Sequence, residues 1–354
     1  MKTEVIDQIE PVEPYVAAHG FANRHVMTIA AAAWPRRVPH VVASQRNRLF
    51  PVSDCDSILV AGNDASVIRQ VGRDSHCPDD SDRRPGRSVV LLVHGLEGCA
   101  DSHYMLGLAY KCLFAGIDTV RVNLRNCGGT AGHCRTLYNA GMSGDIIALA
   151  EDLVANQGYE QVFLFGVSLG GNIVLKAACE LGRAGVGYLA GVCAVSPSLD
   201  LSTCVAAMGS GVNRIYDLNF VFALKAKIRE KVKYFPGLFD TELLKHVKTI
   251  RQFDDLFTAP DGGYDSAAHY YQEASAISMM QWSKAPILII TAKDDPIVPF
   301  ASFQAKSLKG DNIKILAPDR GGHGGFLAAR AGGSALCDRF WSEDQALQFF
   351  RDLA

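Results

Sequence analysis

The sequence predicts an α/β fold in which helices cover both faces of a mostly parallel, doubly wound sheet. Three observations support this fold class. Short apolar runs alternate with helix-like stretches along most of the chain, which is the order expected of βαβ units. The central runs are apolar at every position, as in strands covered on both faces. The alternation stops between residues 198 and 283, which indicates a helical insertion between two core strands.

The composition is that of a globular protein. The 354 residues are 48% hydrophobic and 20% charged, with a net charge of -2, and we expect one domain spanning residues 1–354. So small a net charge argues against nucleic acid as a partner. The amino-terminal residues are mixed and acidic, and no apolar run approaches the length of a membrane span. The sequence therefore predicts a cytoplasmic protein with no integral membrane segment.

The cysteines predict neither disulfides nor a metal site. Ten cysteines in a chain without a secretory signal are expected to be free, buried thiols. Cys99 lies between His94 and His103, and Cys134 follows His133, but no metal-ligand spacing accompanies them. We expect no metal and no other cofactor.

The first third of the chain prepares the sheet. Residues 1–40 are interrupted by prolines and are expected to form an amino-terminal arm wrapped on the domain, in which His25 makes structural hydrogen bonds. Residues 41–71 contain short β-prone pieces that predict early antiparallel strands. Residues 73–87 are polar and are expected to form an exposed loop.

The remaining elements follow from hydrophobic patterning. Strands are expected at residues 88–93, 119–123, 161–167, 189–195, 286–290 and 312–316, and helices at 104–114, 144–156, 173–181 and 346–353. A capping box of Ser342 and Gln345 is expected to start the last helix.

The insertion at residues 198–283 is expected to act as a lid over the site. Three of its apolar residues are expected to shape an acyl pocket: Phe220, Phe222 and Phe239. Its segment 224–233 holds five basic residues and one acid, and their spacing favours a solvated helix over a patch for anionic lipid. Weak contact with a membrane surface stays open as an alternative.

A Gly-x-Ser-x-Gly pentapeptide lies at the centre of the predicted sheet. It runs from Gly166 through Ser168 to Gly170, after an apolar run and before a helical stretch, as a nucleophile elbow requires. The glycines are needed because strand and helix approach most closely there. The elbow predicts that Ser168 is a nucleophile.

The partners of Ser168 follow from the order nucleophile, acid, histidine. His323 is the one histidine after residue 287, and it lies in a glycine-rich loop after the last strand. Asp294 and Asp295 follow the preceding strand. Asp295 is preferred because Pro296 restricts its backbone, and Asp294 is the second choice. Backbone amides of Leu96 and Leu169 are expected to form an oxyanion hole, with His94 supporting the site from behind.

Several motifs together resemble the YheT-type α/β hydrolases of the AB hydrolase 4 family. They begin at His94, Asn123, Gly166, Asp294 and Gly321, and Tyr270-Tyr271 with Ser275 and Asn23-Arg24-His25 with Thr28 match as well. The resemblance covers nearly the whole chain and implies carboxylic-ester hydrolysis by Ser168, Asp295 and His323, with acyl-lipid substrates in some relatives. Animal relatives carry a membrane anchor, and we expect none in this chain. Asn126 departs from the family, which usually has glycine there.

Three functions are therefore weighed. A serine esterase acting on a small-molecule ester is the leading hypothesis. An acyltransferase would use the same acyl-enzyme and differ only in the acceptor. A non-catalytic ligand-binding protein on the same fold is the third, and it would have no need for three intact catalytic groups.

Overall fold

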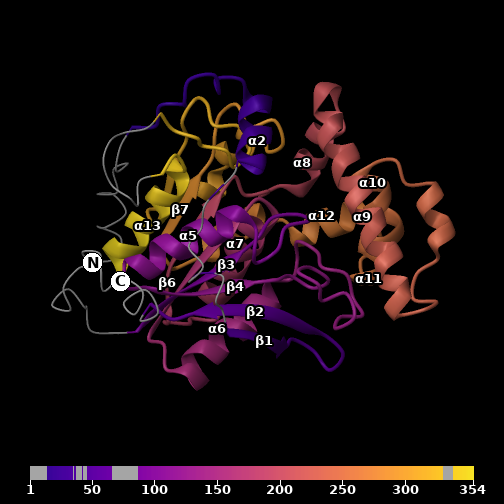
Figure 1. Cartoon of the computed structure of the whole chain (residues 1–354), viewed down its shortest axis with the longest axis horizontal. Coiled ribbons are helices and arrows are strands. Elements are labelled where there is room, and N and C mark those ends of the chain that lie inside the picture. The colour runs from indigo at the N-terminus through magenta and orange to yellow at the C-terminus, as the bar shows by residue number, and fades with distance from the viewer. Residues whose placement is uncertain (1–13, 35, 37–41, 43–45, 66–86, 330–337) are drawn as a thin grey trace.

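The computed structural model describes residues 14–34, 36, 42, 46–65, 87–329 and 338–354, and its centre is an eight-stranded sheet. The strands lie in the order β1-β2-β4-β3-β5-β6-β7-β8 (Figure 1). The antiparallel strands are β1 (Arg46–Pro51) and β2 (Ser57–Asn63), and β2 is also antiparallel to β4. The parallel strands are β3 (Ser88–Val93), β4 (Asp118–Val122), β5 (Gln161–Val167), β6 (Leu189–Val195), β7 (Ile287–Ile290) and β8 (Ile313–Leu316). The predicted fold class is confirmed.

Two helical layers cover the sheet because its strands are apolar on both sides. In β3, Val89, Leu91 and Val93 belong to the core shared with α6 (Ser143–Gln157) and α7 (Leu169–Arg183). The alternate residues Val90 and Leu92 belong to the core shared with α5 (His103–Phe114) and α13 (Trp341–Leu353). Strand alternation therefore divides the interior into two cores.

The strand order places a ligand site at one edge of the sheet. The chain enters the parallel part at β3, moves outward to β4, and returns past β3 to β5. In such doubly wound sheets, ligands bind beyond the carboxyl ends of the strands near the reversal. The loops after β3, β5 and β7 all end in this region.

The predicted arm contains a helix that the sequence analysis did not identify. Helix α2 (Arg24–Ala33) begins after Asn23, whose side chain accepts hydrogen bonds from two backbone amides. It was missed because only Met27, Thr28 and Ala31 are buried, too few positions to produce a clear periodicity. Residues 1–13 and most of the predicted loop at 73–87 lie outside the described residues.

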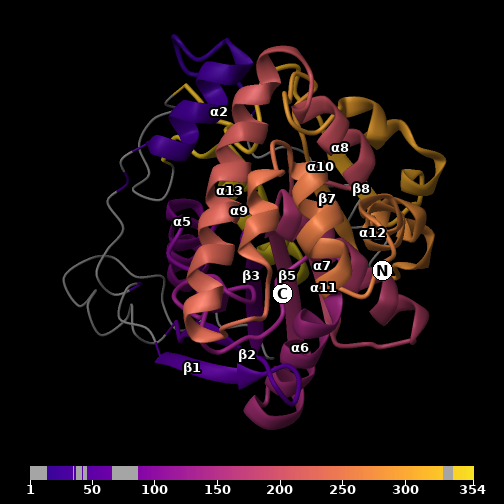
Figure 2. The same cartoon turned by 90° about the vertical axis from the view of Figure 1, so that its right-hand side faces the viewer.

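The segment between β6 and β7 is helical, as expected. It contains α8 (Leu201–Met208), α9 (Arg214–Tyr234), α10 (Ile250–Phe253), α11 (Ala259–Asp261) and α12 (Ala267–Ala274). A π-helical turn, Asp254–Thr258, joins α10 to α11. Helices α9, α10 and α11 lie together at the right of Figure 1 and face the viewer in Figure 2.

The predicted capping box is wrong. Helix α13 begins at Trp341, and its N-cap residue Phe340 makes no side-chain capping bond. Ser342 and Gln345 therefore lie inside the helix, where both are buried. Among the described residues, no helix is both long enough and apolar enough to cross a membrane.

Candidate active site

Ser168 lies in a tight turn between β5 and α7. Its backbone adopts φ 55° and ψ -117°, a conformation that residues other than glycine rarely adopt and that is found in functional turns. A Cβ atom on Gly166 would lie 2.3 Å from the carbonyl oxygen of Gly170. A Cβ on Gly170 would lie 2.4 Å from the carbonyl oxygens of Val93 and His94. Both glycines of the pentapeptide are thus required by close backbone approach.

The structure brings the three predicted polar residues together. The hydroxyl oxygen of Ser168 lies 2.9 Å from Nε2 of His323. On the other side of the ring, Nδ1 lies 2.9 Å from Oδ2 of Asp295. Oδ1 of Asp295 accepts hydrogen bonds from the amides of Ile297 and Val298, at 2.8 and 2.9 Å. These two amides fix the carboxylate against the imidazole.

The second-choice acid has a different position. Oδ1 of Asp294 accepts a hydrogen bond from the amide of Gly322 at 2.9 Å. Asp294 therefore holds the loop that carries His323, whereas Asp295 faces the ring itself. The side chains of these adjacent residues point in different directions, so one contacts the loop backbone and the other contacts the imidazole.

The His323 loop is held from two further elements. The amide of His323 donates to Oγ1 of Thr28 in helix α2 at 2.9 Å, and the amide of Gly324 donates to Oγ of Ser196 at 3.0 Å. Gly322, at φ 60°, leaves no room for a side chain, because a Cβ would lie 2.6 Å from Thr28 Oγ1. Helix α2 therefore helps to position the histidine. Thr28 was noted in the sequence only as part of a family motif, and Ser196 was not identified.

The two amides predicted for an oxyanion hole lie at the expected edge. Leu169 is the first residue of α7, so its amide has no acceptor within the helix. The amide of Gly95 donates to the hydroxyl of Tyr104, and that of Glu97 donates to the hydroxyl of Tyr138, both at 3.0 Å. These bonds fix the backbone on both sides of Leu96.

Glu97 and Tyr138 form a reciprocal pair that the sequence analysis did not identify. The Tyr138 hydroxyl donates to Oε1 of Glu97 at 2.6 Å while accepting from the Glu97 amide. Glu97 needs this support because its backbone has φ 59°. Nζ of Lys227, from α9, lies 3.6 Å from the same Oε1 atom. No local sequence signal connects residues so far apart.

His94 lies behind this loop and is neutral. Burial lowers its pKa to about 4. Its Nδ1 atom lies 2.7 Å from the carbonyl oxygen of Gly95, and its Nε2 atom accepts from the amide of Leu124 at 3.1 Å. It supports the loop and does not contact Ser168 in any described hydrogen bond.

An apolar pocket opens beside Ser168. Ser168, Leu96 and Leu169 contribute to its wall, and the helical insertion supplies most of the rest. Its main apolar side chains from the insertion are Leu201, Val205, Met208, Phe220, Leu224 and Phe253. A pocket of this kind suits a hydrocarbon chain.

The predicted roles of two phenylalanines are wrong. Phe220 lines the pocket, as expected. Phe222 is 75% exposed, because two positions along a helix turn a side chain to the opposite side. Phe239 is half-buried against the ring of Phe257, with centroids 6.0 Å apart, and it is not a pocket residue.

Comparison with known proteins identifies the family. A family model described as the alpha/beta hydrolase fold matches residues 88–327. YheT of Escherichia coli, named as a candidate esterase, is 30% identical over 334 residues, covering 94% of this chain and 91% of that protein. The chain belongs to the α/β-hydrolase fold family. The resemblance to YheT-type hydrolases is confirmed.

More distant relatives of this α/β hydrolase carry lipid-related names. A monoacylglycerol lipase of Saccharomyces cerevisiae is 27% identical over 78% of this chain and 62% of its own. Human phospholipase ABHD3 is 23% identical over 80% of this chain and 66% of its own. Among solved structures, an esterase of Pyrococcus furiosus shares the fold, with a TM-score of 0.54 and 14% identity over 90% of this chain and 97% of its own.

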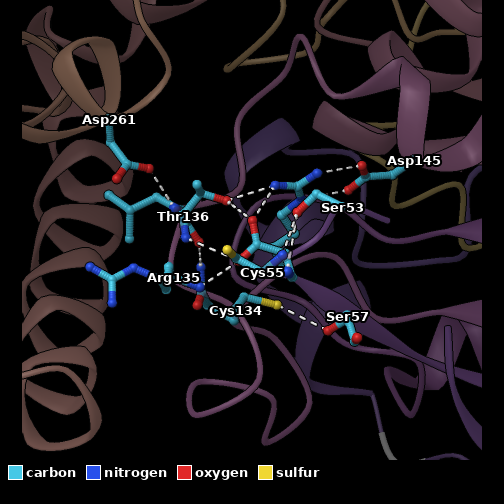
Figure 3. Close-up of polar contacts among 12 residues, drawn as sticks. Ser53, Cys55, Ser57, Cys134, Arg135, Thr136, Asp145 and Asp261 are labelled. Carbon is cyan, nitrogen blue, oxygen red and sulfur yellow. Dashed lines mark hydrogen bonds and ion pairs between the residues drawn. The ribbon is translucent and has the colours of Figure 1, made fainter. Parts of the chain in front are cut away.

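A buried ion network supports the loop that follows β4 in this α/β hydrolase. The guanidinium of Arg125 makes two bonds of 2.7 and 2.8 Å to Asp145 and one of 2.7 Å to Asp56. Thr136 bonds to both Arg125 and Asp56. The amide of Leu137 bonds to Asp261 of the insertion at 2.6 Å (Figure 3). The network ties the pocket wall at residues 137–139 to both sheet and insertion.

Asn126 lies in a turn of the loop after β4, with its backbone in the left-handed region. Its φ of 63° is in the left-handed region, which asparagine tolerates better than other side chains. Its amide nitrogen donates to the carbonyl of Thr136 at 2.5 Å, and its oxygen accepts from Lys231. Asn126 is buried and does not line the pocket.

The prediction of a solvated basic helix is wrong for two residues of α9. Lys231 is buried, and burial lowers its pKa to about 8. Nζ of Lys227 donates to the carbonyl of Asn126 at 2.8 Å, and Lys227 lines the pocket. Both point inward, toward the loop after β4.

The remaining polar clusters hold no metal-like arrangement in the part of the chain that the structure describes. No group of three or more histidine, cysteine, aspartate or glutamate side chains is placed to share an ion. The eight described cysteines are free thiols, and six of them are buried.

His25 makes a hydrogen bond of 3.0 Å to Tyr216.

Proposed function

We propose that this chain is a serine hydrolase that cleaves carboxylic esters through an acyl-enzyme on Ser168. The observation that supports it is the continuous hydrogen-bonded chain from Ser168 through His323 to Asp295, beside an apolar pocket. A serine hydroxyl is a weak nucleophile until a neighbouring base accepts its proton. His323 has the geometry to do so.

In the acylation step, Oγ of Ser168 attacks the ester carbonyl while its proton passes to Nε2 of His323. Asp295 holds the Nδ1 proton and stabilises the imidazolium that forms. The amides of Leu96 and Leu169 donate to the developing oxyanion, and each such donor is typically worth about 3 kcal/mol. The alcohol then leaves with the proton from Nε2. Water then attacks the acyl-enzyme while Nε2 of His323 accepts its proton. The carboxylic acid leaves as that proton passes from Nε2 to Oγ of Ser168.

The substrate class that we propose is an ester with a medium or long acyl chain. The pocket is lined mainly by aliphatic and aromatic side chains. One relative is named as a monoacylglycerol lipase and another as a phospholipase. In this proposal the insertion at residues 198–283 acts as the lid that forms the acyl pocket, within a single domain.

The nucleophile is tested with a fluorophosphonate probe. The wild type and Ser202→Ala, a control at an exposed serine, should be labelled equally, whereas Ser168→Ala should not be labelled. Full labelling of Ser168→Ala would refute the assignment.

The acyl pocket is tested with p-nitrophenyl esters from acetate to octanoate. Phe220→Ala should lower kcat/KM for octanoate about ten-fold or more and change acetate turnover little, because about 1.5–3 kcal/mol accompanies burial of such a side chain. Phe222→Ala is the matched control and should keep the wild-type profile. Equal losses on every ester would contradict the pocket assignment.

Acyl transfer to an alcohol is a second candidate. One relative, from Saccharomyces cerevisiae and 25% identical over 265 residues, is named as a medium-chain fatty acid ethyl ester synthase/esterase. Adding ethanol to the octanoate assay distinguishes the two outcomes, since transfer yields ethyl octanoate and hydrolysis yields octanoic acid.

A further inference from the structure

Exposed apolar side chains are concentrated on two neighbouring helices. Nine large hydrophobic side chains are exposed in the described part of the chain, and six of them lie on α2 or on the first half of α9 and the turn before it. We call these six the apolar face: Val26, Ile29, Val212, Ile215, Leu218 and Phe222. Large exposed apolar patches on soluble proteins generally mark interaction sites.

Helix α9 is apolar on two opposite sides in its first half. Its inner side buries Tyr216, Val221 and Leu224, and Phe220 on the same side lines the acyl pocket. Its outer side carries members of the apolar face at spacings of three and four residues, which places them in one stripe. Packing of the protein core explains the inner side only.

The same outer stripe becomes basic along the helix. Continuing from Phe222 in steps of four, three and four residues leads through Ala226 to Arg229 and Lys233, both exposed. Arg24 and Arg214 are exposed at the other end of the apolar face. The two acids of α9 are Asp217, which is buried, and Glu230, which is exposed. Exposed positive charge therefore borders the apolar face at both ends.

The apolar face is continuous with the elements of the proposed active site. His25 of α2 bonds to Tyr216 of α9 at 3.0 Å, and their rings stack with centroids 5.9 Å apart. One turn along α2, Thr28 accepts the hydrogen bond from the amide of His323. Of the two helices that carry the apolar face, α2 thus positions the histidine and α9 lines the pocket.

We propose that the apolar face docks this protein on an anionic lipid surface, from which the acyl pocket takes its substrate. An apolar helical stripe bordered by basic residues fits the boundary between acyl chains and negatively charged headgroups. The inference rests on the proposed function only for the nature of the substrate. Binding to lipid is measured separately from turnover, so each claim fails independently.

The test uses sedimentation with vesicles of phosphatidylcholine alone or of three parts phosphatidylcholine to one part phosphatidylserine. The wild type should bind the anionic vesicles at low salt and bind phosphatidylcholine much more weakly. The variant L218S/F222S should bind at least ten-fold more weakly. The variant R229Q/K233Q should lose the preference for phosphatidylserine. Leu49→Ser, at an exposed apolar residue on β1, is the matched control and should bind as the wild type does.

Turnover of soluble p-nitrophenyl acetate should stay within two-fold of the wild type in all these variants, which shows that they fold. Ser168→Ala should bind vesicles normally. The proposal is overturned if the wild type does not bind anionic vesicles, or if L218S/F222S binds as well as Leu49→Ser. It is also overturned if light scattering shows a wild-type dimer that L218S/F222S dissociates, because the apolar face would then join two copies. Vesicle binding without any ester turnover would refute the proposed function alone.

Discussion

Replacing Asp295 by asparagine should remove most activity through the histidine tautomer. Oδ1 of Asp295 accepts two backbone amides, from Ile297 and Val298, so the oxygen of an asparagine must take that position. Its NH2 group would then face Nδ1 of His323, which lies 2.9 Å from Oδ2 in the wild type. A donor there forces Nδ1 to accept and Nε2 to carry the proton. Nε2 could no longer accept the proton of Ser168.

The expected loss is about 10⁴-fold in kcat, as found for this exchange in serine proteases, or roughly 5 kcal/mol of barrier. The assay is steady-state hydrolysis of p-nitrophenyl butyrate, with the melting temperature as the check of folding. Asp294→Asn is the matched control. An asparagine oxygen still accepts from the amide of Gly322, so that variant should lose less than about ten-fold. A dead Asp294→Asn beside an active Asp295→Asn would refute the reasoning.

Three other variants test the surroundings of the site. Gly170→Ala should unfold at a lower urea concentration and lose activity, because the Cβ of the alanine would lie 2.4 Å from the carbonyl oxygen of His94. A variant as stable as the wild type would contradict the close approach of strand and helix at the nucleophile turn. Tyr138→Phe removes both hydrogen bonds to Glu97 and should lower kcat about ten-fold with little change in KM. A change in KM alone would argue against a role of Tyr138 in positioning the loop that carries Leu96. Burial raises the pKa of Asp254 from 3.8 to about 6, so the native state retains a proton that the unfolded chain has lost. The free energy of unfolding should therefore fall by about 3 kcal/mol as the pH rises through this interval, and urea titrations of Asp254→Asn should lack that fall.

The sheet and the three hydrogen-bonded residues of the site could be predicted from the sequence. The signals for the strands are local, and the three site residues occur in a known order along the chain. Continuous apolar runs identify strands buried on both faces. The order of Ser168, Asp295 and His323 along the chain allowed the three to be associated before their distances were known. Pro296 was sufficient to prefer one of two adjacent acids, and the hydrogen bond of Asp295 to His323 agrees with that preference.

Features that depend on how elements pack could not be predicted in the same way. Phe220 and Phe222 are the same type of residue, two positions apart. Only the packing of α9 against the protein makes Phe220 a pocket residue and Phe222 a surface residue. The inward direction of Lys231 depends on carbonyl groups contributed by the loop after β4. The hydrogen bond from the His323 amide to Thr28 of helix α2 joins residues nearly 300 positions apart in the chain.

Direct detection of the acyl-enzyme tests the central claim most closely. The wild type would be mixed with p-nitrophenyl octanoate, quenched in acid within the first turnover, digested and mapped by mass spectrometry. We expect a burst of p-nitrophenol that approaches one equivalent per active site and an octanoyl group on Ser168. An octanoyl group on another residue, or ester hydrolysis that proceeds at full rate in Ser168→Ala, would contradict the account.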